Sequence, residues 1–194
     1  MKSDVITISS KGAHMEEALA QAEKTAAYKG LDRKQTLHLR LLTEEMMGMM
    51  RSIAGDVSGT FWIEDEDQVY ELHLKVTTSM NIEKREKLLS ASTSGRNEAE
   101  KGIMGKIRSW FEPADDLPLF FTTMAAEDPA GIRTFTWTLY TYREQLEQYR
   151  QENQYGAEEA WDELEKSVVS HVADDVKVSI RGCDVEMVIV KKMA

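Results

Sequence analysis

The chain contains one cysteine, Cys183, and three prolines, and it lacks any apolar run near the roughly 18 residues of a membrane span. A single cysteine excludes an internal disulfide framework. One cysteine and four scattered histidines also argue against a zinc site, which needs several closely placed thiolate or imidazole ligands. Because Cys183 falls in a predicted turn between strands, we expect an unreactive thiol rather than a nucleophile.

Basic charge is scarce as well. The 24 lysines and arginines are outnumbered by 34 aspartates and glutamates, which gives a net charge of −10. Nucleic acids and anionic membranes attract clustered basic side chains, so we expect neither as a partner. The first ten residues, MKSDVITISS, lack the apolar core and cleavage site of a signal peptide, and we therefore expect a cytoplasmic protein.

The most distinctive segment is residues 31–53, LDRKQTLHLRLLTEEMMGMMRSI. We predict one amphipathic helix here, with Asp32 as the N-cap and Gln35 completing a capping box. Glu44 and Glu45 are adjacent near its middle, and adjacent helical side chains diverge by about 100°, so at most one enters a pocket. Two interpretations of the pair stay open: a solvated edge of the helix, or one functional carboxylate. An apolar stripe follows helical spacing: Leu39, Leu42, Met46, Met49 and Ile53.

The remaining pattern predicts an α+β fold. Alternating apolar residues predict strands at 4–9, 60–64 and 69–77 and a final hairpin at 176–189. Helical spacing predicts helices at 14–29, 81–91, 98–111 and 157–173, and a strand at 132–142 is expected to turn into helix near Tyr142. We predict one domain, 1–194, in which helices cover one face of a mixed, mostly antiparallel sheet as a two-layer sandwich.

Three groups of side chains outside the carboxylate pair carry predictions. His73 falls on the polar face of its alternating strand, so we expect a solvent-facing histidine rather than a ligand. The methionines at 46, 47, 49 and 50 fit either core filler or an adaptable apolar surface for a partner. Aromatic residues beyond Pro113 fit either a small satellite core or an interaction surface: Trp137, Tyr140, Tyr142, Tyr149, Tyr155 and Trp161.

The order of an opening strand, a helix, a short link, a long helix with a carboxylate pair and an antiparallel hairpin resembles the histidine-kinase-like (GHKL) ATPase superfamily. In layout it is most similar to the bacterial anti-sigma serine kinases. The resemblance covers residues 4 to about 110 and the final hairpin, and it implies a Bergerat-like fold. A segment at 112–156 looks like an insertion into that fold.

The resemblance implies roles for particular residues. Glu45 stands where the family has its general base, which polarises the attacking water or hydroxyl. Met49 stands where the family has the asparagine that holds Mg²⁺, and a thioether is a poor ligand for a hard cation. Thr78 stands near the family's adenine-binding aspartate. The lid that covers the phosphates would use backbone N–H groups and positive charge at Gly95, Arg96, Gly102, Gly105 and Lys106.

Three functional hypotheses stay open. In the first, the chain is an active Mg-ATP-binding serine kinase or ATPase with Glu45 as the base. In the second, it is a degenerate member of the family that acts through protein contacts. The third hypothesis is an unrelated α/β binding domain. Met49 and Thr78 favour the degenerate member. Its partner would be a sigma-factor-like or anti-anti-sigma-like regulator, and a homodimer is also compatible with the sequence.

Overall fold

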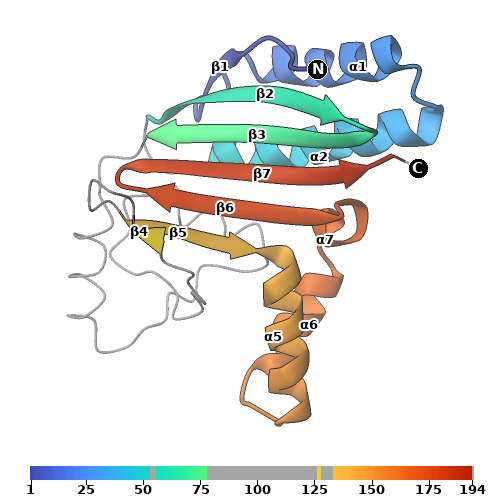
Figure 1. The fold of residues 1–194 in the computed structure, drawn as a ribbon. Helices are drawn as coiled ribbons and strands as arrows, with labels where there is room; N and C mark the ends of the chain where they lie inside the picture. The colour runs from blue at the N-terminus through green and yellow to red at the C-terminus, as the bar shows by residue number, and fades with distance from the viewer. Residues whose placement is uncertain (53–55, 78–125, 128–132, 194) are drawn as a thin grey trace.

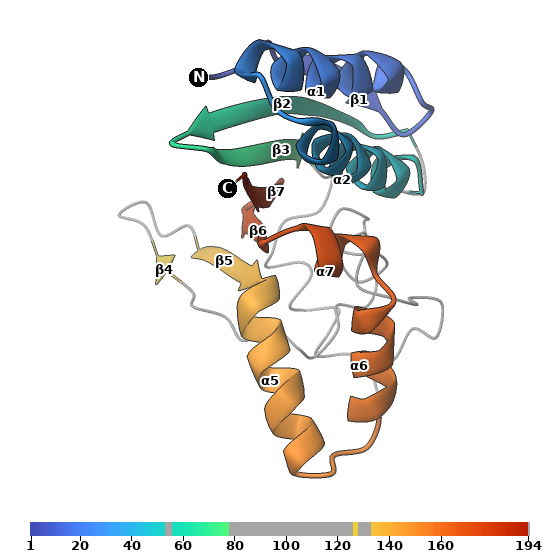
Figure 2. The ribbon, with the colours of Figure 1, turned by 90° about the vertical axis from the view of Figure 1, so that its right-hand side faces the viewer.

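The computed structural model describes residues 1–52, 56–77, 126–127 and 133–193, and these form the predicted α+β sandwich (Figure 1). A seven-stranded sheet forms one layer, and helices α1 and α2 cover one of its faces (Figures 1 and 2). The strands lie in the order β1-β2-β3-β7-β6-β5-β4, and every described pairing is antiparallel. The strands are β1 (Ile6–Ser9), β2 (Ser58–Glu66), β3 (Val69–Thr77), β4 (Ala126–Glu127), β5 (Arg133–Thr138), β6 (Asp175–Arg181) and β7 (Asp184–Lys192).

The described helices fall into two groups. Helices α1 and α2 pack against each other and on the sheet, and α7 contacts α2 on the same side. Helices α5 and α6 pair with each other and extend away from the β5 end of the sheet (Figure 2). Their bounds are α1 (Met15–Lys29), α2 (Arg33–Ser52), α5 (Leu139–Gln151), α6 (Ala157–Glu165) and α7 (Val168–Val172).

Local signals place the two covering helices where the sequence predicts them. Gly30 adopts a left-handed backbone with φ of 66° and ends α1, a conformation that glycine reaches without steric cost. The predicted capping box precedes α2: the Gln35 backbone N–H donates to Asp32 Oδ1 at 2.8 Å, and the Asp32 N–H donates to Gln35 Oε1 at 3.0 Å. These bonds satisfy two backbone donors that would otherwise lack a helical partner.

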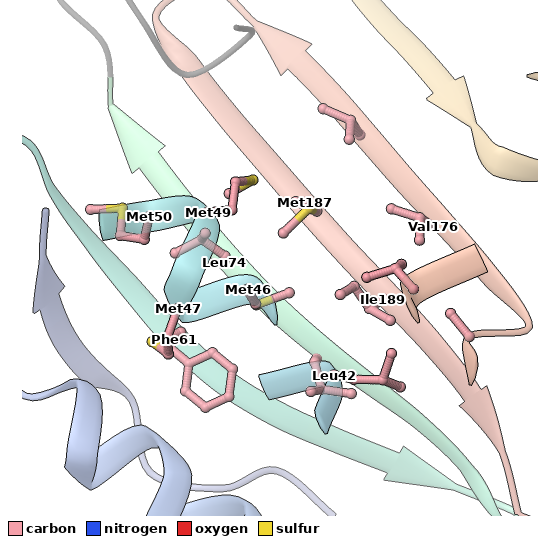
Figure 3. Packing of buried hydrophobic residues seen from close by; sticks show 14 of the residues in the cluster. Leu42, Met46, Met47, Met49, Met50, Phe61, Leu74, Val176, Met187 and Ile189 are labelled. Atoms are coloured by element: carbon pink, nitrogen blue, oxygen red, sulfur yellow. The ribbon is translucent and has the colours of Figure 1, made fainter. Parts of the chain in front are cut away.

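The stripe on α2 faces the sheet and forms the centre of the core. Leu39, Leu42 and Met46 are completely buried, and all four methionines of the cluster belong to the core (Figure 3). They pack with Phe61 and Leu74 from the hairpin, while Ile53 lies outside the described residues. The core interpretation of the methionine cluster is therefore confirmed.

The β2–β3 hairpin also follows its predicted alternation. Its two central turn residues, Asp67 and Gln68, both have positive φ, of 47° and 63°. Such a turn matches the right-handed twist of the flanking strands. Alternate β3 residues from Tyr70 to Val76 are buried against the helices. The other face of the sheet is covered by none of the described helices (Figure 1).

Two predicted boundaries differ from the structure. The strand at 132–142 gives way to helix at Leu139 rather than near Tyr142, because the Thr138 side chain accepts a hydrogen bond from the Thr141 N–H and caps α5. The single helix predicted at 157–173 is two helices, because the Ser167 side chain caps α7 and starts it anew. The helical spacing of apolar residues continues through such a break, so the spacing could not reveal the break.

Part of the predicted insertion at 112–156 belongs to the main sheet. Strand β5 pairs with β6 from Thr134 to Thr138, and α5 begins directly after it. The helices predicted at 81–91 and 98–111 lie outside the described residues.

Candidate functional site

The predicted carboxylate pair lies on α2 with its two members in different surroundings. Glu44 is exposed and pairs with Arg40 one turn earlier, with Nε at 3.0 Å from Oε1. Glu45, the predicted base, is half-buried beside the buried Met46. The two side chains diverge as adjacent helical residues must, so Glu45 alone of the pair is placed near the core.

The positions of the other predicted nucleotide-binding residues relative to Glu45 are not described. Thr78 and the lid residues lie outside the described part of the chain. These lid residues are Gly95, Arg96, Gly102, Gly105 and Lys106.

Met49 is the residue whose position bears most directly on nucleotide chemistry. Its side chain is 4% exposed and belongs to the hydrophobic core. Figure 3 shows it with Leu74 of β3 and Met187 of β7 in the layer between α2 and the sheet. A core thioether cannot replace the asparagine oxygen that would hold Mg²⁺.

A second group of polar and aromatic side chains gathers on the sheet face that none of the described helices covers (Figure 1), which we call the helix-free face. His73, on β3, lies opposite Trp62 of β2 and Val188 of β7. The prediction put His73 on the correct face but in the wrong environment, because the residue is only 9% exposed. The neighbouring strands supply the side chains that cover it.

The His73 ring makes contacts on its face and at both ring nitrogens. It stacks on the Trp62 ring with centroids 4.7 Å apart and planes 7° from parallel. Its Nδ1 lies 3.1 Å from Oε1 of Glu186 on β7. Its Nε2 is buried and has no hydrogen-bond partner among the described residues, and the nearest carboxylate oxygen is Oε2 of Glu71 at 3.6 Å. We call Trp62, Glu71, His73 and Glu186 the His73 cluster.

Ion pairs surround the His73 cluster. Lys2 Nζ lies 4.6 Å from the Trp62 ring centroid and 2.9 Å from Glu64 Oε1. Glu64 also accepts a 2.8 Å hydrogen bond from Trp62 Nε1, and the bonds from Lys2 and then Trp62 lower the pKa of its carboxyl group. Two further ion pairs cross between strands: Lys75 lies 2.9 Å from Asp184, and Lys177 lies 3.8 Å from Glu71.

The hydrogen bond with His73 lowers the pKa of Glu186, and it outweighs the opposing effect of burial. A carboxylate whose pKa is lowered by a partner favours its ionised form. Glu186 is therefore an anion next to the imidazole across the ordinary pH range. The cluster thus combines an aromatic platform, a titratable ring and two carboxylates in one place.

Within the described ranges, no group of three or more histidine, cysteine or acidic side chains is arranged to hold a metal ion. In the same part of the chain, no helix has the length and apolar character that a membrane crossing requires. Cys183 is half-buried in the β6–β7 turn.

No family model, curated protein or solved structure matches this chain.

A sequence signal for the cluster did exist. The alternation that buries Phe61 and Leu72 requires Trp62 and His73 to share the opposite face, and a two-residue turn places them across from each other. No local signal, however, could indicate Glu186, which lies 113 residues from His73. Its position depends on the pairing of β3 with β7.

Proposed function

We propose that this chain is a regulatory protein with a histidine-kinase-like ATPase fold that has lost nucleotide turnover and acts through contacts with another protein. The burial of Met49 carries the proposal. At the position where the resembling family holds Mg²⁺, this chain places a core side chain. A sigma-factor-like or anti-anti-sigma-like regulator is the partner that the resemblance suggests.

The helix-free sheet face supports a contact function. It presents the half-buried Trp62 beside Lys2 and Glu64, and Lys177 pairs with Glu71 of the His73 cluster. Protein interfaces are enriched in aromatic residues at their centre and polar at their rim. The face therefore has the composition of a binding surface, and Trp62 is its aromatic centre.

One observation favours the alternative of an active Mg-ATP enzyme. Glu45 is half-buried on α2, at the position where the resembling family has its general base. An enzyme would still need another ligand for Mg²⁺ in place of Met49. Nucleotide binding distinguishes the two functions, because only the active enzyme binds Mg-ATP.

The first experiment is a thermal unfolding series with and without Mg-ATP. A ligand at a hundredfold excess over its Kd stabilises the native state by about 2.7 kcal/mol. At about 2–4 °C per kcal/mol for a chain of this size, binding would raise Tm by roughly 5–11 °C. We expect no change at millimolar Mg-ATP. A rise in Tm, with hydrolysis that Glu45→Gln abolishes, would establish the enzyme instead.

The second experiment tests the contact function directly. A protein that copurifies with the chain is isolated, and its affinity is measured for the native chain, for Trp62→Ala and, as a matched control, for Tyr140→Ala. Tyr140 is an exposed aromatic residue on α5, 61% accessible and outside the His73 cluster. We expect at least a tenfold loss of affinity, about 1.4 kcal/mol, for the Trp62 variant alone. Equal affinities for both variants would remove this face from the proposal.

A further inference from the structure

Helices α5 and α6 form a hairpin that extends away from the β5 end of the sheet (Figure 2). We call residues 143–166, which include most of this hairpin and its turn, the arm. These 24 residues contain eight acidic and three basic side chains, so they carry half of the chain's net charge of −10. Seven of the eight carboxylates are exposed. The arm therefore presents concentrated negative charge away from the body of the sheet.

Part of this charge opposes the helix that carries it. On α6, Glu159 lies three residues before Asp162 and four before Glu163, and like charges at these spacings repel each other along one helix face. The last turn of α6 contains no basic residue, so Glu163 and Glu165 lie at the negative end of the helix dipole without compensation. Helix stability thus does not account for these carboxylates, and a cationic partner would relieve their repulsion.

The two arginines of the arm are held within the fold itself. Arg143 donates a hydrogen bond to the Ser170 carbonyl oxygen. The Arg150 guanidinium lies 4.7 Å from the Trp161 ring centroid, and its Nε lies 3.2 Å from Glu158 Oε2. Two of the three cations are therefore occupied by internal contacts, and most of the negative charge of the arm stays unbalanced.

The arm is anchored at its base and ends in an exposed aromatic side chain. Leu146 of α5 and Leu164 of α6 are buried in the hydrophobic core. At the tip, the Gln154 N–H donates to the Tyr149 carbonyl oxygen at 2.9 Å, and the next residue, Tyr155, is 90% exposed. A surface that is ordered before binding loses little entropy on binding, and a tyrosine ring can stack on an arginine side chain.

We propose that the arm is a docking surface for a basic protein partner, whose lysine and arginine side chains pair with the exposed carboxylates and whose contact reaches Tyr155. Charge complementarity selects this occupant, because a surface of this sign repels nucleic acids and anionic proteins. The arm contains no residue of the His73 cluster and excludes Tyr140. It is a second contact surface, and it does not depend on the one around Trp62.

An oligoarginine peptide serves as the probe, and its affinity for the full chain is measured by calorimetry at low salt. The arm variant combines Glu147→Gln, Glu159→Gln and Asp162→Asn, which remove three exposed charges. We expect it to bind the peptide at least tenfold more weakly than the native chain. Tyr155→Ala should bind about threefold more weakly, because the stack with arginine is lost. The arm variant should unfold at no lower temperature than the native chain, because it loses like-charge repulsion.

A control variant makes the same change in net charge outside the arm. It combines Asp4→Asn, Glu16→Gln and Glu66→Gln, which are also exposed positions. We expect its affinity for the peptide to stay within about threefold of the native value, since only distant, screened charges are removed. Trp62→Ala should leave the peptide affinity unchanged, which separates this test from that of the helix-free face.

Three outcomes would overturn the docking surface. Equal losses in the arm and control variants would mean that the peptide responds to net charge alone, and a native chain that does not bind the peptide at low salt would show that the arm attracts no basic partner. The third readout uses only the native chain and needs no variant to fold. Amide NMR shifts on addition of the peptide should concentrate in residues 143–166, and shifts concentrated elsewhere contradict the proposal.

Discussion

Replacing Met49 with asparagine restores the residue type that holds Mg²⁺ in the resembling ATPases, and it tests whether this position faces a core or a nucleotide. In the structure the Met49 side chain is 4% exposed between α2 and the sheet. Full burial of a methionine side chain contributes about 1.5–3 kcal/mol, and a buried amide without partners costs about 1–3 kcal/mol. We therefore expect Met49→Asn to lower the free energy of unfolding by about 3–5 kcal/mol.

Chemical denaturation followed by circular dichroism measures this change, with two matched variants beside it. Met49→Leu conserves volume and should cost less than about 1.5 kcal/mol. Leu37→Asn repeats the apolar-to-amide change on the same helix at a residue that is 51% exposed, and it should cost under about 1 kcal/mol. If Met49→Asn costs no more than Leu37→Asn, or if it gains stability from Mg-ATP, the position faces an open site and our reasoning is refuted.

Three further substitutions test backbone space and pH dependence. Gly48→Ala should raise stability by about 0.5–1 kcal/mol, because Gly48 is an exposed position of α2 and a Cβ there meets nothing within 4 Å. Gly59→Ala should lower stability by about 1–3 kcal/mol, because its Cβ would lie 2.9 Å from the Lys75 carbonyl oxygen. Equal effects of the two substitutions in urea denaturation would contradict both expectations. The hydrogen bond with His73 lowers the pKa of Glu186. The stability that ionised Glu186 contributes is therefore present above the ordinary carboxyl pKa range, and it is lost as the pH falls through the folded-state pKa. Glu186→Gln should therefore cost about 1 kcal/mol at pH 6 and almost nothing near pH 3. A cost that stays constant between these pH values would exclude the ionised, hydrogen-bonded carboxylate as its source.

The local features of the fold could be predicted because each depends on a few neighbouring residues. Asp32 and Gln35 form a capping box through bonds that span three residues, and Gly30 ends α1 through its own backbone conformation. The buried faces of α2 and β3 follow from periodicity alone. The break between α6 and α7 escaped prediction because the cap at Ser167 competes with a helical pattern that continues through it.

The candidate site was less predictable because its parts come from distant segments. Glu45 lies half-buried on α2, the helix predicted at 31–53, and its role as a base stays a prediction. His73 was assigned to the correct face and the wrong environment. Alternation reports the direction of a side chain and not what covers it, and here Trp62 and Glu186 cover the ring.

By itself the sequence determined where the covering helices start and end, which of their faces is apolar, and which side of the β2–β3 hairpin meets the core. These properties depend on contacts between residues a few positions apart, and such contacts leave a periodic pattern. The tertiary structure alone decided that β7 pairs with β3, and this pairing brings Glu186 to His73. Strand pairing over more than a hundred residues depends on the packing of the whole sheet. For that reason the chemistry on the helix-free face appears only when the chain is folded.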